Sequence, residues 1–82
     1  MSDSQNTLDE HYRECYEGEL RALKRRKEID ADFSANVVRG TLETLYNVDG
    51  NNWDGRSAVF QIELDAQIDA LETFLHELEN KN

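Results

Sequence analysis

The fold of this 82-residue chain depends on residues 24–32, which read Lys24-Arg25-Arg26-Lys27-Glu28-Ile29-Asp30-Ala31-Asp32. The stretch contains neither glycine nor proline, and Lys, Arg, Glu and Ala are good helix formers. We therefore predict that one helix continues through it, with a kink near 29–32 as a variant. The alternative is a bend at 29–32 that folds the first segment back as a third helix.

The clear break in the helical pattern follows at residues 47–55, which read Asn47-Val48-Asp49-Gly50-Asn51-Asn52-Trp53-Asp54-Gly55. Glycine and asparagine tolerate positive φ, and clusters of them mark turns. The sequence therefore predicts a turn at 47–54 between two helices of about 8–46 and 55–79.

The first helix has a start signal at residues 7–10, because Thr7 followed three residues later by Glu10 matches a capping box. Residues 1–6 are expected to be a disordered tail, and residues 7–80 a single helical domain. Behind the start, apolar residues recur every three or four positions and line one helical face. They are Leu8, Tyr12, Tyr16, Leu20 and Leu23.

The last helix carries a heptad seam of apolar residues that predicts structural core. The seam consists of Leu64, Ile68, Leu71, Leu75 and Leu78. If the chain reverses near Asn51, residues whose numbers sum to about 101 face one another in an antiparallel pair. That register places residues 24–27 beside residues 74–77. The predicted fold class is all-α, an antiparallel helical hairpin of long helices.

The hairpin leaves part of its first helix uncovered, because that helix is longer than the second. Tyr12, Tyr16 and Leu20 lie in this overhang and need a partner for their apolar surface. We expect two copies to dimerise into a four-helix arrangement, since two-fold symmetry is the commonest. The alternative is the three-helix bundle monomer, in which the bend at 29–32 covers the overhang.

Composition restricts the partners and the compartment. Eighteen Asp and Glu against nine Lys and Arg give a net charge of −9, which repels a phosphate backbone. Apolar runs of two or three residues predict no membrane span, and the N-terminus lacks the pattern of a signal peptide. Cys15 is the only cysteine, so no structural disulfide forms within the chain. We expect a cytoplasmic protein that binds neither nucleic acid nor membranes.

No catalytic constellation is present in the sequence. The chain has no Gly-x-Ser-x-Gly turn and no glycine-rich phosphate loop, so we predict no enzymatic activity, no catalytic residues and no cofactor. Asn47, Asp49 and Asn51 alternate as the first oxygen ligands of a calcium loop do. The twelfth position is Ala58 where a glutamate must close the coordination shell, which predicts an ordinary turn.

A metal site is also not predicted. His11 and Cys15 are four residues apart and share one helical face, but a zinc site usually has four ligands. The other histidine, His76, lies at the far end of the chain. In the hairpin register His11 lies beyond the end of the last helix, so closing a site would need another subunit.

These exclusions leave association with another protein as the predicted function. An adaptor, a chaperone-like binder and a small regulator all fit, with Tyr12, Tyr16, Leu20 and Trp53 as contact residues. The alternative is an acidic mimic of nucleic acid that uses Glu63, Asp65, Asp69 and Glu72. The basic block 24–27 is interpreted either as a charged seam satisfied by the acids of the last helix or as a solvated face.

Overall fold

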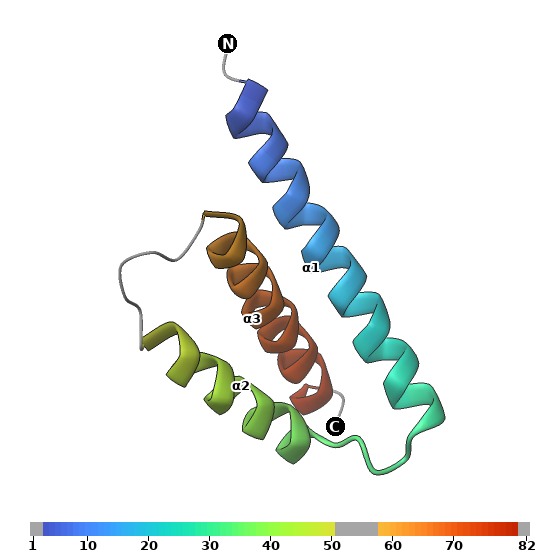
Figure 1. Ribbon diagram of the computed structural model, residues 1–82. Coiled ribbons are helices and arrows are strands. Elements are labelled where there is room, and N and C mark those ends of the chain that lie inside the picture. Colours follow the sequence, from blue (N-terminus) through green and yellow to red (C-terminus); the bar gives the residue numbers. More distant parts are fainter. Residues whose placement is uncertain (1–2, 51–57, 81–82) are drawn as a thin grey trace.

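A computed structural model of the chain describes residues 3–50 and 58–80, which form three helices (Figure 1). The helices are α1 (Asp3–Ile29), α2 (Ala35–Gly50) and α3 (Ala58–Glu79). No strand occurs within these residues, which confirms the all-α prediction. The three-helix alternative fits this arrangement, whereas the two-helix hairpin does not.

The structure has two helices, α1 and α2, where the sequence predicts one helix over about 8–46. Asp30 makes the break, because its carboxylate Oδ1 accepts a hydrogen bond of 3.0 Å from the Asp32 backbone N–H. Its backbone carbonyl accepts a second bond, of 3.1 Å, from the Phe33 N–H. This Asx turn competes with helical hydrogen bonding and needs neither glycine nor proline. α2 then starts with a bond of 3.2 Å from the Val38 N–H to the Ser34 carbonyl.

Burial of Phe33 holds the turn in place. Its side chain is 2 % exposed, and its ring stacks on that of Phe74 in α3 with 5.9 Å between centroids. The guanidinium of Arg26 lies over the Phe33 ring, 4.4 Å from its centroid. A stacked aromatic pair adds about 0.5–1.5 kcal/mol beyond its area of burial. The bend therefore depends on a contact between residues 41 positions apart, as well as on the local turn.

Two further boundaries differ from the predicted ones. Residues 3–6, expected as a tail, belong to α1, so this helix starts before the capping box at Thr7. Residues 47–50, expected as the beginning of the turn, belong to α2. Residues 51–57, with Trp53, lie outside the described residues. α3 starts at Ala58 in the described chain and ends at Glu79, in agreement with the predicted end.

α3 is the shared element of the fold, since it packs against both other helices, whereas α1 and α2 do not pack against each other within the described residues. Side-chain contacts join His11 to Glu63 and Tyr16 to Thr73, so α1 and α3 run in the same direction. Tyr46 contacts Glu72, and α2 runs antiparallel to α3 (Figure 1). The predicted antiparallel pairing of α1 with α3 is thus corrected, because the break at 30–34 reverses the chain once more.

The core lies along α3 and takes residues from all three helices. Leu64, Ile68 and Leu71 of the heptad seam are buried, whereas Leu75 and Leu78 are partly buried and pack against this core. No polar or charged residue is buried in the described part of the chain. None of the three helices, over these residues, combines the length and the apolar composition of a membrane-spanning segment. The buried residues are Leu23, Phe33, Val38, Leu42, Leu64, Ala66, Ile68, Ala70, Leu71 and Phe74.

Candidate functional site

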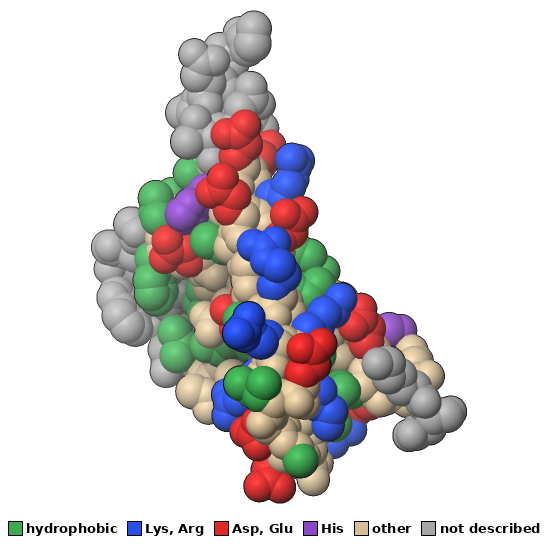
Figure 2. All heavy atoms as spheres, turned by 90° about the vertical axis from the view of Figure 1, so that its right-hand side faces the viewer, with side chains coloured by type: hydrophobic (Ala, Val, Ile, Leu, Met, Phe, Trp, Pro, Cys, Tyr) green, Lys and Arg blue, Asp and Glu red, His purple; other side chains and the backbone are tan. Residues whose placement is uncertain are grey.

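Four basic side chains form an exposed stripe along the C-terminal half of α1, which we call the basic stripe. Figure 2 shows this side of the molecule, where Lys and Arg side chains lie along the helix, interspersed with Asp and Glu side chains. Arg26 is excluded, because its guanidinium covers the Phe33 ring and lies 3.9 Å from the Asp30 carboxylate. The basic stripe consists of Arg21, Lys24, Arg25 and Lys27.

The acids of α3 do not neutralise this stripe in the way that the sequence predicts. Glu72 accepts a hydrogen bond from the Tyr46 hydroxyl, and Glu79 forms an ion pair with Arg39, so both carboxylates contact side chains of α2. Among the described residues, no ion pair includes a member of the basic stripe. The interpretation as a satisfied charged seam is therefore corrected: four cations stand exposed on a chain whose net charge is −9.

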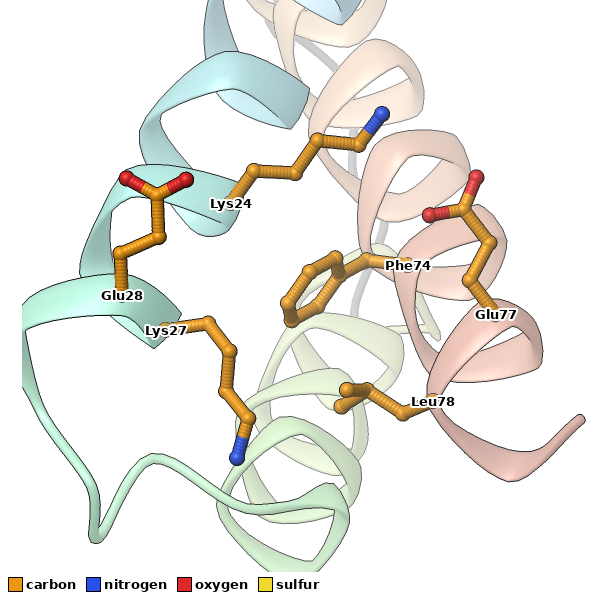
Figure 3. Close-up of a pocket in the computed structure, with 6 residues that line it drawn as sticks. All are labelled: Lys24, Lys27, Glu28, Phe74, Glu77 and Leu78. Atoms are coloured by element: carbon orange, nitrogen blue, oxygen red, sulfur yellow. The ribbon is translucent and has the colours of Figure 1, made fainter. Parts of the chain in front are cut away.

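The predicted neighbourhood of residues 24–27 and 74–77 is nevertheless present, as a pocket of about 350 Å³ between α1 and α3. In Figure 3 the Phe74 ring and the Leu78 side chain point into the space between the two helices. Lys24 extends toward α3 on one side of them, and Lys27 lies on the other. We call this the stripe pocket, and its lining residues are Lys24, Lys27, Glu28, Phe74, Glu77 and Leu78.

The stripe pocket combines an apolar floor with walls of mixed charge, which two lysines and two glutamates supply. Phe74 is almost fully buried and Leu78 is half-buried, so they offer the edge of the core as a floor. Lysine stems are themselves apolar and carry their charge at the tip. Glu28 and Glu77 are the two acids on the rim. The pocket therefore suits an apolar side chain, and the exposed Arg21 and Arg25 outside it add a preference for neighbouring carboxylates.

The predicted contact residues on α1 pack within the chain. The Tyr12 hydroxyl donates to the Asp69 carboxylate, and the Tyr16 hydroxyl lies 2.9 Å from Thr73 Oγ1. Leu20 packs against the core. The overhang that led us to name these residues is absent, because α3 covers this face of α1. Their role toward a partner stays a prediction, and Trp53 lies outside the described residues.

The Tyr12 hydroxyl is held in its protonated form. Its hydrogen bond to Asp69, followed by burial and the charge of Asp69, raises the pKa of Tyr12 to about 12. Such a bond to a carboxylate is stronger than a bond between neutral groups. Tyr12 therefore acts as a neutral donor between α1 and α3 at physiological pH.

The four carboxylates of the predicted nucleic-acid mimic are engaged with their own chain. Glu63 and Asp69 meet α1 through His11 and Tyr12, and Glu72 meets α2. Asp65 accepts a bond of 2.9 Å from the Gln61 side chain on α3 itself. Since they face different neighbours, they do not form one continuous acidic row.

A cluster of three possible metal donors lies on the other flank of the α1–α3 interface. His11 Nε2 is 2.9 Å from Glu63 Oε2 and 3.8 Å from Cys15 Sγ. All three donor atoms lie within 4.8 Å of one another. Burial, and then the charges of Glu63 and Glu14, raise the pKa of the Cys15 thiol. Sequence reasoning missed Glu63 because the hairpin register pairs it with a different part of the first helix.

Comparison with protein-family models, with curated proteins and with solved structures finds no match to this chain. Its function is therefore argued from its own residues.

Proposed function

We propose that this chain is a small protein-interaction module that binds an acidic segment of a partner protein through the basic stripe and the stripe pocket. The observation that carries the proposal is the position of Arg21, Lys24, Arg25 and Lys27. These four cations are exposed and form no ion pair among the described residues, and two of them, Lys24 and Lys27, line a pocket with an apolar floor. The module fits an adaptor, a chaperone-like binder or a regulator.

Both the charge and the shape of this surface favour an acidic segment with an apolar anchor. Clustered cations on a negatively charged chain steer an acidic partner to one face, because opposite potentials raise the association rate. An apolar side chain that enters the stripe pocket would meet Phe74 and Leu78. Buried anchors of this kind supply most of the affinity at protein interfaces, whereas charges at the rim supply orientation.

Nucleic acid fits this surface less well than a protein segment does. The net charge of −9 repels a phosphate backbone over the Debye length of about 8–10 Å. The acidic mimic is not favoured either, since its carboxylates contact side chains of the same chain.

A second copy of the chain is one partner with the required chemistry. Residues 61–80 contain six acids and no Lys or Arg, and the contacts that five of these acids make within their own chain would have to exchange for contacts with the basic stripe of the second copy. The predicted homodimer therefore remains part of the proposal. The absence of enzymatic activity and the cytoplasmic location likewise remain predictions.

Site-specific photo-crosslinking in the native host tests the proposal. Ala22 is exposed and lines a shallow hollow beside Arg21, Lys24 and Arg25, so a photoreactive phenylalanine there samples the basic stripe. We expect one predominant protein adduct, which is lost in the Lys24→Glu/Lys27→Glu double variant. An adduct at twice the mass of the chain identifies a second copy as the partner.

The matched control places the same photoreactive residue at Glu43, which is exposed on α2 and distant from the basic stripe in sequence. Few or no adducts are expected there. Equal crosslinking at Ala22 and Glu43, or no adduct at Ala22, contradicts the proposal. Circular dichroism of the double variant checks that its helices form.

A further inference from the structure

We infer that His11, Cys15 and Glu63 form a binding site for a divalent metal ion of the zinc class. The inference does not rest on the proposed protein-binding function, because the cluster and the basic stripe lie on opposite flanks of the face that α1 presents to α3. It rests on the donor atoms, their convergence and the cavity beside them.

The donors come from two helices that the fold brings together. His11 and Cys15 are separated by one helical turn, the spacing that places two side chains on the same face of α1. Glu63 comes from α3, 52 residues away from His11 in sequence. An ion bound by all three would therefore link α1 directly to α3.

The distances suit a small cation. In a tetrahedral zinc site with bonds of about 2.0–2.3 Å, neighbouring donor atoms lie about 3.3–3.8 Å apart. Cys15 Sγ and His11 Nε2 are already 3.8 Å apart, and the 2.9 Å from Nε2 to Glu63 Oε2 needs only a small separation. The third pair, Cys15 Sγ and the Glu63 carboxylate oxygen, lies within 4.8 Å and would have to approach by up to about 1–1.5 Å.

Hydrogen bonding explains only part of the cluster. Glu63 Oε2 and Cys15 Sγ both approach the same imidazole nitrogen, Nε2 of His11. That nitrogen has either one proton to donate or one lone pair to accept, so it serves one partner fully. Convergence of a carboxylate, a thiol and an imidazole on one point is the arrangement that donors adopt around an ion.

The donor set selects the class of metal. Imidazole and thiolate bind zinc and related transition metals, whereas magnesium and calcium prefer all-oxygen sites. Three protein donors leave a fourth position open, and a cavity of about 240 Å³ adjoins the cluster. Glu19, one turn beyond Cys15, and Gln67, one turn beyond Glu63, line this cavity with them.

The ion can reach the cluster from solvent, and its two positive charges are balanced by the Cys15 thiolate and the Glu63 carboxylate. The side chains of His11 and Glu63 are 35 % and 50 % exposed. Binding breaks the hydrogen bond between them, and the proton on Nε2 passes to Nδ1 by exchange with solvent, which frees the Nε2 lone pair. The metal then forms bonds to Nε2, Sγ and Oε2, and the thiol proton is released to solvent. No oxidant or reductant takes part.

Titration of the full chain with Co²⁺ tests the site, because cobalt takes the place of zinc and reports its ligands by absorption. We expect one equivalent to bind with a thiolate-to-cobalt charge-transfer band, and Zn²⁺ to displace it. Cys15→Ala should lose the band. Glu63→Gln should weaken binding by about tenfold or more, since even the outer partners of metal ligands contribute about 10–100-fold.

The matched control is Glu17→Gln, which removes an exposed carboxylate from α1 outside the cluster and should bind as the unchanged chain does. A readout without variants is the thermal midpoint, which should rise with Zn²⁺ because the ion binds the folded chain. Absence of a thiolate band, or equal Zn²⁺ affinity in the unchanged chain and in Cys15→Ala, overturns the inference. So does an unchanged midpoint at saturating Zn²⁺.

Discussion

Across the α1–α3 interface, polar side chains meet in specific pairs, whereas the α2–α3 interface buries apolar side chains and keeps its polar pairs outside. Tyr12 and Tyr16 reach Asp69 and Thr73 through part-buried hydrogen bonds. On the other side Val38 and Leu42 are buried, and the polar pairs of α2 with α3 are exposed. Leu23 of α1 is buried in the same core, so apolar packing holds both neighbours of α3, and α1 differs by its part-buried polar pairs.

This difference means that stability and register depend on different contacts. Apolar burial is non-directional and roughly proportional to area, so α2 can gain most of its free energy without a unique set of partners. Hydrogen bonds between part-buried groups require a specific distance and angle, so the tyrosines of α1 define how that helix aligns along α3. Substitutions in the two interfaces should thus change the free energy of unfolding by different amounts.

The largest effect is expected from Leu42→Ala in the α2–α3 interface. Leu42 is 4 % exposed, and truncation of a buried leucine costs about 2–5 kcal/mol through lost burial and the remaining cavity. A domain of this size has roughly 4–12 kcal/mol of stability in total, so a large fraction would be lost. Urea unfolding followed by circular dichroism measures it. Glu43→Ala, at the adjacent exposed position, should change stability by less than about 0.5 kcal/mol.

The sequence predicts the helical class, the seam of α3 and the face that each helix buries, because apolar periodicity reports these directly. It does not report which helix covers which face. Residues 24–27 lie beside residues 74–77 in both the predicted antiparallel register and the observed parallel one, since the two registers cross at Lys24 and Glu77. The prediction that residues 24–27 lie beside residues 74–77 is therefore correct although the predicted direction of α1 is wrong.

The break at 30–34 explains why the direction is missed. Local helix propensity favours continuity there, but the Asp30 turn and the burial of Phe33 against Phe74 favour a bend. The second of these is a tertiary contact and leaves no periodic signal. The same limit applies to the metal donors: the spacing of His11 and Cys15 indicates a shared face, but Glu63 joins them only when α1 and α3 run parallel.

A smaller effect is expected from Tyr16→Phe in the α1–α3 interface. The change keeps the ring, which stacks on Tyr12 at 6.1 Å, and removes the hydroxyl that meets Thr73. A hydrogen bond of this type contributes about 0.5–1.5 kcal/mol, and the same measurement applies. Thr73→Val and the double variant complete a cycle that isolates the pair. If the stability losses of Tyr16→Phe and Thr73→Val simply add in the double variant, the two hydroxyls do not interact, and the α1–α3 interface is not more specific than the α2–α3 interface.

The smallest effect is expected at the exposed edge of α2, and it depends on pH. Donation of the Tyr46 hydroxyl to Glu72, then burial and nearby charges, raise the pKa of Tyr46 above its ordinary value of 10.0. Below that value Tyr46 is protonated in the folded and unfolded chains, and its stabilisation is fully present. As pH rises through the higher pKa of the folded chain, the unfolded chain ionises first and this stabilisation is lost.

Tyr46→Phe should therefore cost under about 1 kcal/mol near pH 8, and the difference from the unchanged chain should shrink near pH 11. The urea midpoints of the two chains at both pH values measure this difference in stability. Both chains also lose stability at high pH as their other tyrosines and lysines ionise, and this common loss cancels when the two chains are compared. No difference between the two chains near pH 8 would show that the hydroxyl of Tyr46 contributes nothing, and a difference that stays constant up to pH 11 would contradict the raised pKa of Tyr46.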